Sequence, residues 1–334
     1  MKYELLAICL ILSALPMLAT VFALAGLRLW RMVGSRLALE PPREQARMLF
    51  ALRVWPPAAA AAFVIFILLP AYILHEPEQT TEPVSFVLLI ATWICIAGGL
   101  YALGHTIIAF RRTGKLVAEW QHLAEKVSVT DTGIPVWRLR HPLPVIAVVG
   151  VFRPQLFIAD QLFRHLTQDE LDVVLRHEQW HLDSRDNLRR MVFTFCRHFL
   201  FFLPGSGELE REWQESVELA ADDYAAGGDK QKALDLASAL VRIARLFKPG
   251  VDVAMPAAFS FVMTHDGNLE RRIQRLMKIA DADERQDLKN GRGLNLAFRL
   301  MMVFLPFTML MAGLYPGALH TVHQGIELIV GILP

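Results

Sequence analysis

Two histidines lie four residues apart in the run HEQWH, at His177 and His181, and Glu178 directly follows the first of them. On a helix, side chains with this spacing leave one face about 40° apart, so both imidazoles can bind one metal ion. Zinc in such a site lowers the pKa of its bound water and polarises a substrate carbonyl, while a neighbouring carboxylate takes the proton and delivers it to the leaving amine. The motif also arises by chance on charged helix faces, so the prediction of zinc peptidase chemistry depends on a third ligand.

An acidic pair further along the chain can supply that ligand. Glu218 and Asp222 are also four residues apart in a helical pattern, so they share a face. A catalytic zinc site uses three protein ligands and keeps a fourth position open, and Glu218 can complete the set. Asp222 can then accept a hydrogen bond from the far nitrogen of a ligating histidine, which fixes the ring. The neighbouring acidic residues are predicted to form an ordinary solvated helix face: Glu208, Glu210, Glu212, Glu215 and Asp223.

A long helix with a clear start must carry the two histidines. Thr167 and Glu170 form a TxxE capping box, which predicts that a helix begins there and runs through the motif. Three short β-branched and apolar runs before it, separated by prolines, predict a small sheet with an edge strand: 135–139, 145–152 and 156–159. The edge at 145–152 could take up a peptide as an added strand. By contrast, residues 114–127 have helical periodicity.

Apolar blocks dominate the rest of the chain. Of its 334 residues 54% are apolar and 20% charged, and the mean hydropathy of +0.35 exceeds that of ordinary soluble proteins. A helix of about 20 apolar residues crosses a bilayer, and four blocks meet this length: 5–29, 51–74, 84–110 and 294–314. The first block could be a cleaved signal peptide, but its arginines follow the apolar run, which favours a retained anchor. The shorter apolar run at 191–204 predicts the tail of a helix that lies against the membrane surface.

The charges in the loops orient these helices by the positive-inside rule. The segment 28–53 around the first link carries six arginines, whereas the second link, HEPEQTTEP, has three glutamates and neither Lys nor Arg. Basic residues also follow the third block and precede the fourth: Arg111, Arg112 and Lys115, then Lys289 and Arg292. We therefore expect residues 111–292 to face the cytoplasm and both termini to be extracytoplasmic.

Two other classes of function are excluded by charge and cysteine usage. The net charge is +1 and basic residues form no sustained patch with interleaved aromatics, so we expect no nucleic acid partner. The three cysteines, Cys9, Cys95 and Cys196, lie singly in apolar runs without a CxxC pair. They predict small buried or lipid-facing residues and neither a disulfide framework nor a sulfur metal site.

From about 144 to 230 the chain resembles the cytoplasmic peptidase region of the membrane metallopeptidases typified by bacterial β-lactam sensor-transducers. The likeness lies in GVFRPQLFIADQLFRHLTQDELDVVLRHEQWHLDSRDNLRR, FLFFLP and ESVELAADDYAA. It implies a gluzincin-type fold in a bacterial inner-membrane protein, with one zinc ion held by His177, His181 and Glu218, and Glu178 as the base. Asp186 also matches a recurrent aspartate of this pattern, for which helix support and catalysis are equally open.

The resemblance weakens towards the end of the chain. Only residues 315–334 follow the fourth block, so we expect the peptidase and not a β-lactam-sensing domain. A more distant likeness, to heat-shock and prenyl-protein-processing membrane proteases, lies in Thr264 and His265 followed by ERRI at 270–273. In those families a histidine and a following arginine lie by the active site, but here the proline after the histidine is missing and the spacing is one residue longer. His265 is therefore either an oxyanion stabiliser or an ordinary loop histidine.

Together these features predict a membrane α-helical protein with about four transmembrane helices and a cytoplasmic α+β zincin-like peptidase domain. Its expected parts are three membrane helices in 1–110, the peptidase domain in 111–292, and the fourth helix with a short tail in 293–334. The predicted function is a zinc endopeptidase that cleaves cytosolic or membrane-proximal proteins, in signalling or in quality control. The alternative is a non-catalytic transducer with structural zinc, which would have no need of Glu178. Expected partners are a protein or peptide substrate, the lipid bilayer and a regulatory membrane partner of unknown identity.

Overall fold

Long apolar helices form one half of the molecule. The computed structural model describes residues 2–75, 85–127, 135–200, 206–246, 266–281, 304 and 307–332. Helix α1 (Lys2–Leu37) precedes a continuous helical rod of α2 (Pro42–Phe63), a π-helical turn η1 (Val64–Leu68) and α3 (Leu69–His75); α4 (Phe86–Leu123) follows. Three segments are long and apolar enough to cross a membrane: Glu4–Met32, Pro42–His75 and Phe86–Leu123. The first three predicted blocks are thus confirmed as membrane-length helices.

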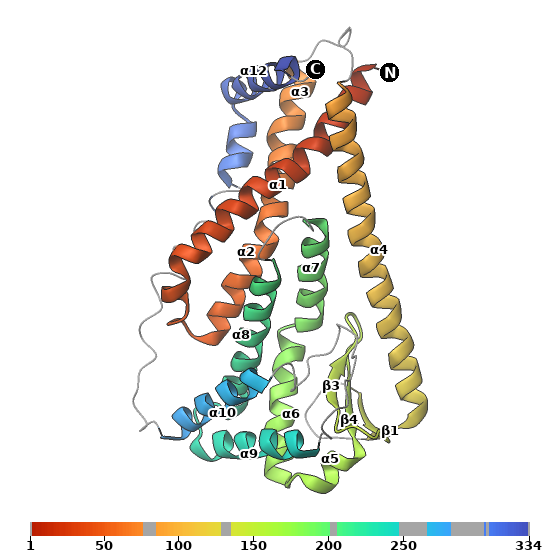
Figure 1. Ribbon diagram of the computed structural model, residues 1–334, viewed down its shortest axis with the longest axis vertical. Coiled ribbons are helices and arrows are strands. Elements are labelled where there is room, and N and C mark those ends of the chain that lie inside the picture. Colours follow the sequence, from red (N-terminus) through yellow and green to blue (C-terminus); the bar gives the residue numbers. More distant parts are fainter. Residues whose placement is uncertain are drawn as a thin grey trace.

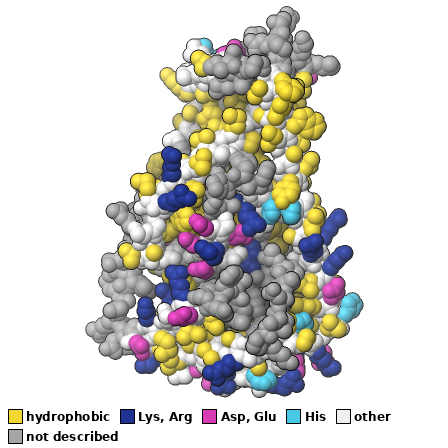
Figure 2. Space-filling model, viewed as in Figure 1, with side chains coloured by type: hydrophobic (Ala, Val, Ile, Leu, Met, Phe, Trp, Pro, Cys, Tyr) yellow, Lys and Arg dark blue, Asp and Glu magenta, His cyan; other side chains and the backbone are white. Residues whose placement is uncertain are grey.

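The surface of these helices is apolar as well. Met17 and Val21 of α1 are 64% and 60% exposed, and Trp93 and Leu100 of α4 are 69% and 64% exposed. Hydrophobic side chains gather over the upper part of the face drawn in Figure 2, whereas charged side chains gather below it. Such a continuous apolar surface is costly in water and fits a lipid environment.

The fourth predicted block is covered only in part, because residues 294–303 lie outside the described residues. Residues 307–313 are helical and lead into α12 (Pro316–Ile332). The sequence analysis expected only a short tail there and did not predict α12. Gly313 lies so close to η1 that a Cβ atom at this position would collide with the carbonyl oxygen of Phe66. A small residue here lets two helical segments pack backbone to backbone.

A four-stranded sheet lies at the far end of α4 (Figure 1). Its strands are β1 (Ala124–Val127), β2 (Val136–Leu139), β3 (Ile146–Val149) and β4 (Gln155–Ala159), in the order β1-β2-β4-β3. The β2–β4 pair is parallel and the other two pairs are antiparallel. The three predicted strands are confirmed, and β3 is an edge strand. The expectation of helix at 114–127 is wrong for its last four residues, because the chain turns from α4 directly into β1.

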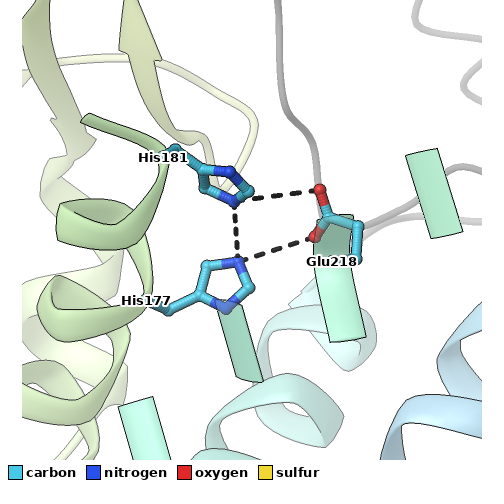
Figure 3. A group of neighbouring side chains, drawn as sticks. All are labelled: His177, His181 and Glu218. Atoms are coloured by element: carbon cyan, nitrogen blue, oxygen red, sulfur yellow. Dashed lines mark hydrogen bonds and ion pairs between the residues drawn. The ribbon is translucent and has the colours of Figure 1, made fainter. Parts of the chain in front are cut away.

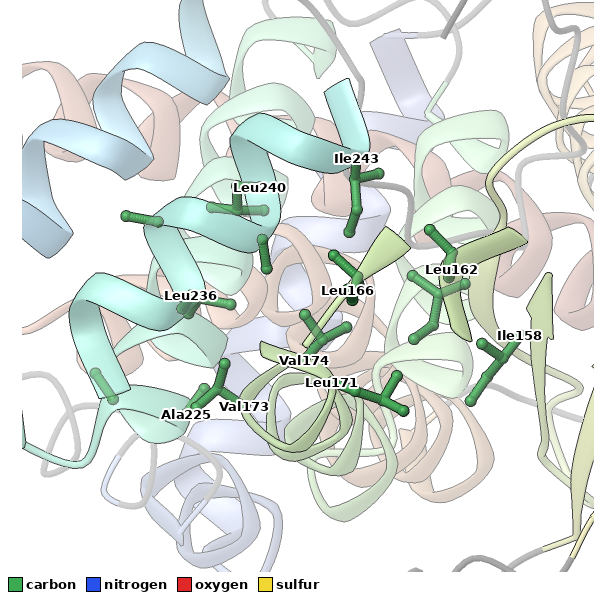
Figure 4. Close-up of a cluster of buried hydrophobic side chains, with 14 of the residues drawn as sticks. Ile158, Leu162, Leu166, Leu171, Val173, Val174, Ala225, Leu236, Leu240 and Ile243 are labelled. Carbon is green, nitrogen blue, oxygen red and sulfur yellow. The ribbon is translucent and has the colours of Figure 1, made fainter. Parts of the chain in front are cut away.

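Six further helices pack on the sheet, on one another and on the membrane-length helices. They are α5 (Asp160–His165), α6 (Gln168–Asp183), α7 (Asp186–Phe199), α8 (Ser206–Ala226), α9 (Lys230–Leu246) and α10 (Asp266–Asp281). The largest core joins one face of the sheet to α6 and α9, through Ile158, Val174, Leu236 and Leu240 (Figure 4). Trp120, near the end of α4, packs on the other face of the sheet. The sheet is thereby held between the membrane helix α4 and the helices that carry the site.

A second core attaches the site to the membrane helices. Leu49 of α2, Phe193 of α7 and Trp213 of α8 are buried together. Helix α7 packs against α2 and α4 and runs alongside them (Figure 1). Residues 191–199 form its last turns, so the expected helix tail is confirmed for these residues, and its place at the membrane surface stays a prediction. Helix α4 also runs without a break through residue 110, where the membrane part was expected to end. The division at 110 and 292 stays a prediction.

Candidate metal centre

Three buried side chains bring their donor atoms together between α6 and α8 (Figure 3). His177 and His181 leave one face of α6, and Glu218 reaches them from α8. The Nε2 atoms of the two histidines are 3.2 Å apart. Glu218 places Oε2 3.5 Å from Nε2 of His177 and Oε1 3.8 Å from Nε2 of His181. All three side chains are nearly inaccessible to solvent.

The capping box explains why α6 begins where it does. The hydroxyl of Thr167 accepts a hydrogen bond from the backbone N–H of Glu170, and the Glu170 carboxylate accepts one from the N–H of Thr167. This reciprocal pair satisfies two amide donors that a helix start leaves unpaired. It confirms the predicted start of the helix and fixes the rotation of α6, so that both histidines face α8.

The geometry of the donors fits a single metal ion. In a tetrahedral zinc site with bonds of about 2.0–2.2 Å, neighbouring ligand atoms lie about 3.3–3.6 Å apart. The Nδ1 atom of His181 is 2.8 Å from Oδ2 of Asp186, and Nδ1 of His177 is 3.0 Å from Oδ1 of Asp222. The carboxylate of Asp186 favours the ring proton of His181 on Nδ1, which leaves the lone pair on Nε2, the atom that faces His177 and Glu218. Where no metal ion binds, a proton between the two Nε2 atoms accounts for their short distance.

The carboxylates around His177 favour a positive charge at its imidazole ring. Burial lowers the pKa of His177, but the carboxylates of Asp222 and Glu218 outweigh it and raise the pKa to about 9. The buried acidic groups therefore stabilise a positive charge at this ring, and the chain supplies it as a proton where no metal ion binds. A divalent ion meets the same demand and leaves the histidine neutral.

Glu178 is placed as a buried carboxylate beside the two histidines. It is 2% exposed, and its Oε2 atom has no hydrogen-bond partner within the described part of the chain. Burial raises the pKa of Glu178, although the neighbouring His181 and His177 act in the opposite direction. A buried acceptor oxygen without a hydrogen-bond partner destabilises the folded chain. Such a group is typical of a general base, which must be able to receive a proton.

Arg272 of α10 is a further buried residue of the site. Its Nε and Nη2 atoms each donate a 2.7 Å hydrogen bond to Asp222, and Nη1 lies 3.1 Å from Oε2 of Glu218. Burial alone would raise the pKa of both carboxyls, but Arg272 and His177 hold the two pKa values below their ordinary range. The ERRI run alone does not distinguish Arg271 from Arg272, and the structure does, because Arg272 is buried in the site whereas the side chain of Arg271 is exposed.

Asp186 reaches His181 across a short break between α6 and α7. Arg185 adopts a left-handed backbone conformation with φ of 52°, which interrupts the helix directly before Asp186. The next residue along, Asn187, donates to the carbonyls of Val148 and Gly150, at 3.0 Å each. The first residue of α7, Asp186, thus contacts the candidate ligand His181, and the second, Asn187, contacts the edge of the sheet. His265, the other residue in question, lies outside the described residues, and its role stays a prediction.

These pKa shifts predict how the stability of the metal-free chain depends on pH. The depressed pKa values of Glu218 and Asp222 contribute stability that is lost as the pH falls through them. The raised pKa of His177 contributes stability that is complete below the ordinary value of 6.5 and is lost as the pH rises towards about 9. We expect the thermal midpoint of unfolding of the chelated chain to decrease as the pH is raised from about 6 to about 9. The midpoint of the zinc-loaded chain should decrease less, because its histidines are neutral ligands. An equal decrease in both forms contradicts this prediction.

Membrane-length helices and a buried group of two histidines and one glutamate, with the carboxylate of Glu178 beside it, characterise a membrane-associated protein with a candidate metal site. Residues 43–276 match the family model described as BlaR1 peptidase M56, so the chain belongs to this family of membrane metallopeptidases. The matched range contains His177, Glu178, His181 and Glu218. No match was found among the curated proteins.

Proposed function

We propose that the chain is an integral-membrane zinc endopeptidase of the gluzincin type. The observation that carries this proposal is the arrangement of His177, His181 and Glu218 around one point, with the buried carboxylate of Glu178 beside them. A purely structural zinc site would use four protein ligands and would need no base. Family membership supports peptidase chemistry at this centre.

The residues of the site divide the work of peptide hydrolysis. His177, His181 and Glu218 would hold the ion, which when bound supplies Lewis acidity to polarise the scissile carbonyl and to acidify water. Glu178 takes the proton from the attacking water and passes it to the leaving nitrogen. Asp222 and Asp186 fix the tautomer and the direction of the two imidazole rings. Arg272 holds Asp222 and Glu218 as carboxylates in a buried setting.

The edge strand β3 lies beside α6, but its four residues are buried, and Asn187 donates hydrogen bonds to the carbonyls of Val148 and Gly150. A substrate that adds to this edge as an extended strand would therefore first have to displace Asn187. The proposal of an endopeptidase rests on membership of the peptidase family. We propose cytosolic or membrane-proximal proteins as substrates, in regulated proteolysis or in quality control.

The proposed topology follows from the loop charges. It has four membrane helices, the metal centre in the cytoplasm and both termini outside. The arginines of segment 28–53 and the acidic link after His75 support this orientation. Cysteine labelling from either side of sealed cells, at positions 79 and 230 in separate variants, tests it. Labelling of position 230 from the outside contradicts it.

Removal and return of the metal test the proposed activity. We expect the full chain in lipid nanodiscs to lose cleavage after chelation and to regain it with equimolar zinc but not with magnesium. Substrates can be identified by comparing protein fragments in cells with and without the chain, and self-cleavage is scored in the same samples. A chain that holds zinc and cleaves neither these substrates nor itself contradicts the proposal and favours a transducer with structural zinc.

A further inference from the structure

Three histidine rings meet at the end of the membrane helices that lies farthest from α6 (Figure 1). His75 is the last residue of α3, and His320 and His323 are three residues apart on α12. The ring centroid of His75 is 5.5 Å from that of His320 and 5.5 Å from that of His323. Within the candidate zinc centre the corresponding distance, between His177 and His181, is 4.9 Å. Both rings of α12 therefore lie close to His75, although the nitrogen atoms of the three rings do not lie within 4.8 Å of one another as the donor atoms of the candidate zinc centre do.

Apolar packing beneath the rings holds their two helices together. Leu319 of α12 is buried against Ile67 and Ala71, and Ile326 is buried against Val64 and Leu68. The close contact of Gly313 with Phe66 fixes the approach to α12. Because the backbones are set by these contacts, convergence of the rings requires only rotation of the side chains.

A backbone carbonyl orients the ring of His75 as such groups do around bound metal ions. Nδ1 of His75 lies 3.1 Å from the carbonyl oxygen of Ala71, which can only accept, so the Nε2 atom of His75 carries the lone pair. A ligating histidine normally has such a carbonyl or carboxylate on its other nitrogen. The carboxylate of Glu327 lies 3.8 Å from Nε2 of His323. The side-chain nitrogen of Gln324 lies 3.0 Å from Nε2 of His320, and a metal ion bound at that nitrogen would replace this contact.

We propose that His75, His320 and His323 bind a divalent transition-metal ion such as zinc, copper or nickel. Imidazole ligands select these ions over magnesium and calcium. The site is separate from the centre on α6, since it lies at the opposite end of the membrane helices (Figure 1). The bound ion would join the end of the Pro42–His75 segment to α12. This proposal does not rest on the peptidase activity, and its test does not measure cleavage.

Zinc stoichiometry tests the site in the full chain, purified without a polyhistidine tag and held in nanodiscs. After incubation with zinc and removal of unbound metal, we expect the wild type to retain one more zinc ion per chain than the His320→Ala/His323→Ala variant. His75→Ala should lose the same ion. His165→Ala is the matched control, because His165 is exposed on α5 and contacts its own helix, and it should retain wild-type zinc.

Two results overturn the proposal. One is equal zinc content in the wild type and in the two histidine-cluster variants, once circular dichroism shows the same helix content and thermal midpoint. The other needs no variant, and so covers the case in which the variants do not fold. Copper added to the chelated wild type should bind as two ions per chain, each with nitrogen couplings from imidazole in the electron paramagnetic resonance spectrum, and binding of only one such ion overturns the site.

Discussion

A chain with glutamine in place of Glu178 should bind zinc as the wild type does and cleave its substrate about 10²–10⁴-fold more slowly. Glutamine keeps the shape of the side chain but cannot take up a proton, so the loss falls on the chemical step. Glu178 is not among the three donors that face one another, and the substitution should leave the metal site whole. The measurement is kcat and zinc content for the same nanodisc samples.

Asp183→Asn is the matched control for this prediction. It makes the same change of charge on the same helix, but Asp183 is exposed and accepts a hydrogen bond from Gln179 at 2.8 Å. Its activity should equal that of the wild type. Wild-type activity in the Glu178→Gln chain would show that another group serves as the base, and loss of zinc would show that the substitution disturbs the site itself.

Arg272→Met should destabilise the folded chain by about 3–5 kcal/mol, because it leaves two carboxylates buried without their counter-charge. Arg272 is 1% exposed and contacts both Asp222 and Glu218. Zinc affinity should fall with stability, since Asp222 would no longer be held against His177. Arg272→Lys should recover only part of the loss, because an ammonium group cannot make the paired hydrogen bonds of a guanidinium. The measurement is urea unfolding with and without zinc.

Arg271→Met provides the comparison at the next position of α10. Arg271 pairs with Glu215 at 3.0 Å on the surface, and its side chain is 60% exposed. Such surface pairs contribute about 0–1 kcal/mol, so this variant should unfold close to the wild type. Equal destabilisation by the two substitutions would contradict the assignment of Arg272 to the site.

The parts of the fold that depend on local patterns were predictable. The capping box of α6, the i, i+4 pairs on α6 and α8, the three apolar helices and the strands β2 to β4 are all marked by short-range signals. Prediction of the candidate metal site required one long-range assumption, namely that Glu218 lies close to the two histidines. The structure brings these three side chains together. Their roles in catalysis stay predictions.

Long-range contacts account for what the sequence did not reveal. Residues 124–127 continue the helical pattern of α4, yet they form a strand because β2 offers a partner. The role of Arg272 depends on Asp222, which lies 50 residues away on another helix. The cluster of His75, His320 and His323 joins segments separated by most of the chain, so no window of sequence contains it.

The direct passage from α4 into β1 has a mechanical consequence. Leu123 is the last helical residue and Ala124 is already extended, with φ of −120° and ψ of 149°, so no loop separates the membrane helix from the sheet. A tilt or rotation of α4 in the bilayer therefore cannot be absorbed by slack in the chain. Such a movement would rotate β1 and, through the hydrogen-bonded strands β2 and β4, would displace β3. Asn187 is bonded to β3, and the preceding residue, Asp186, contacts His181.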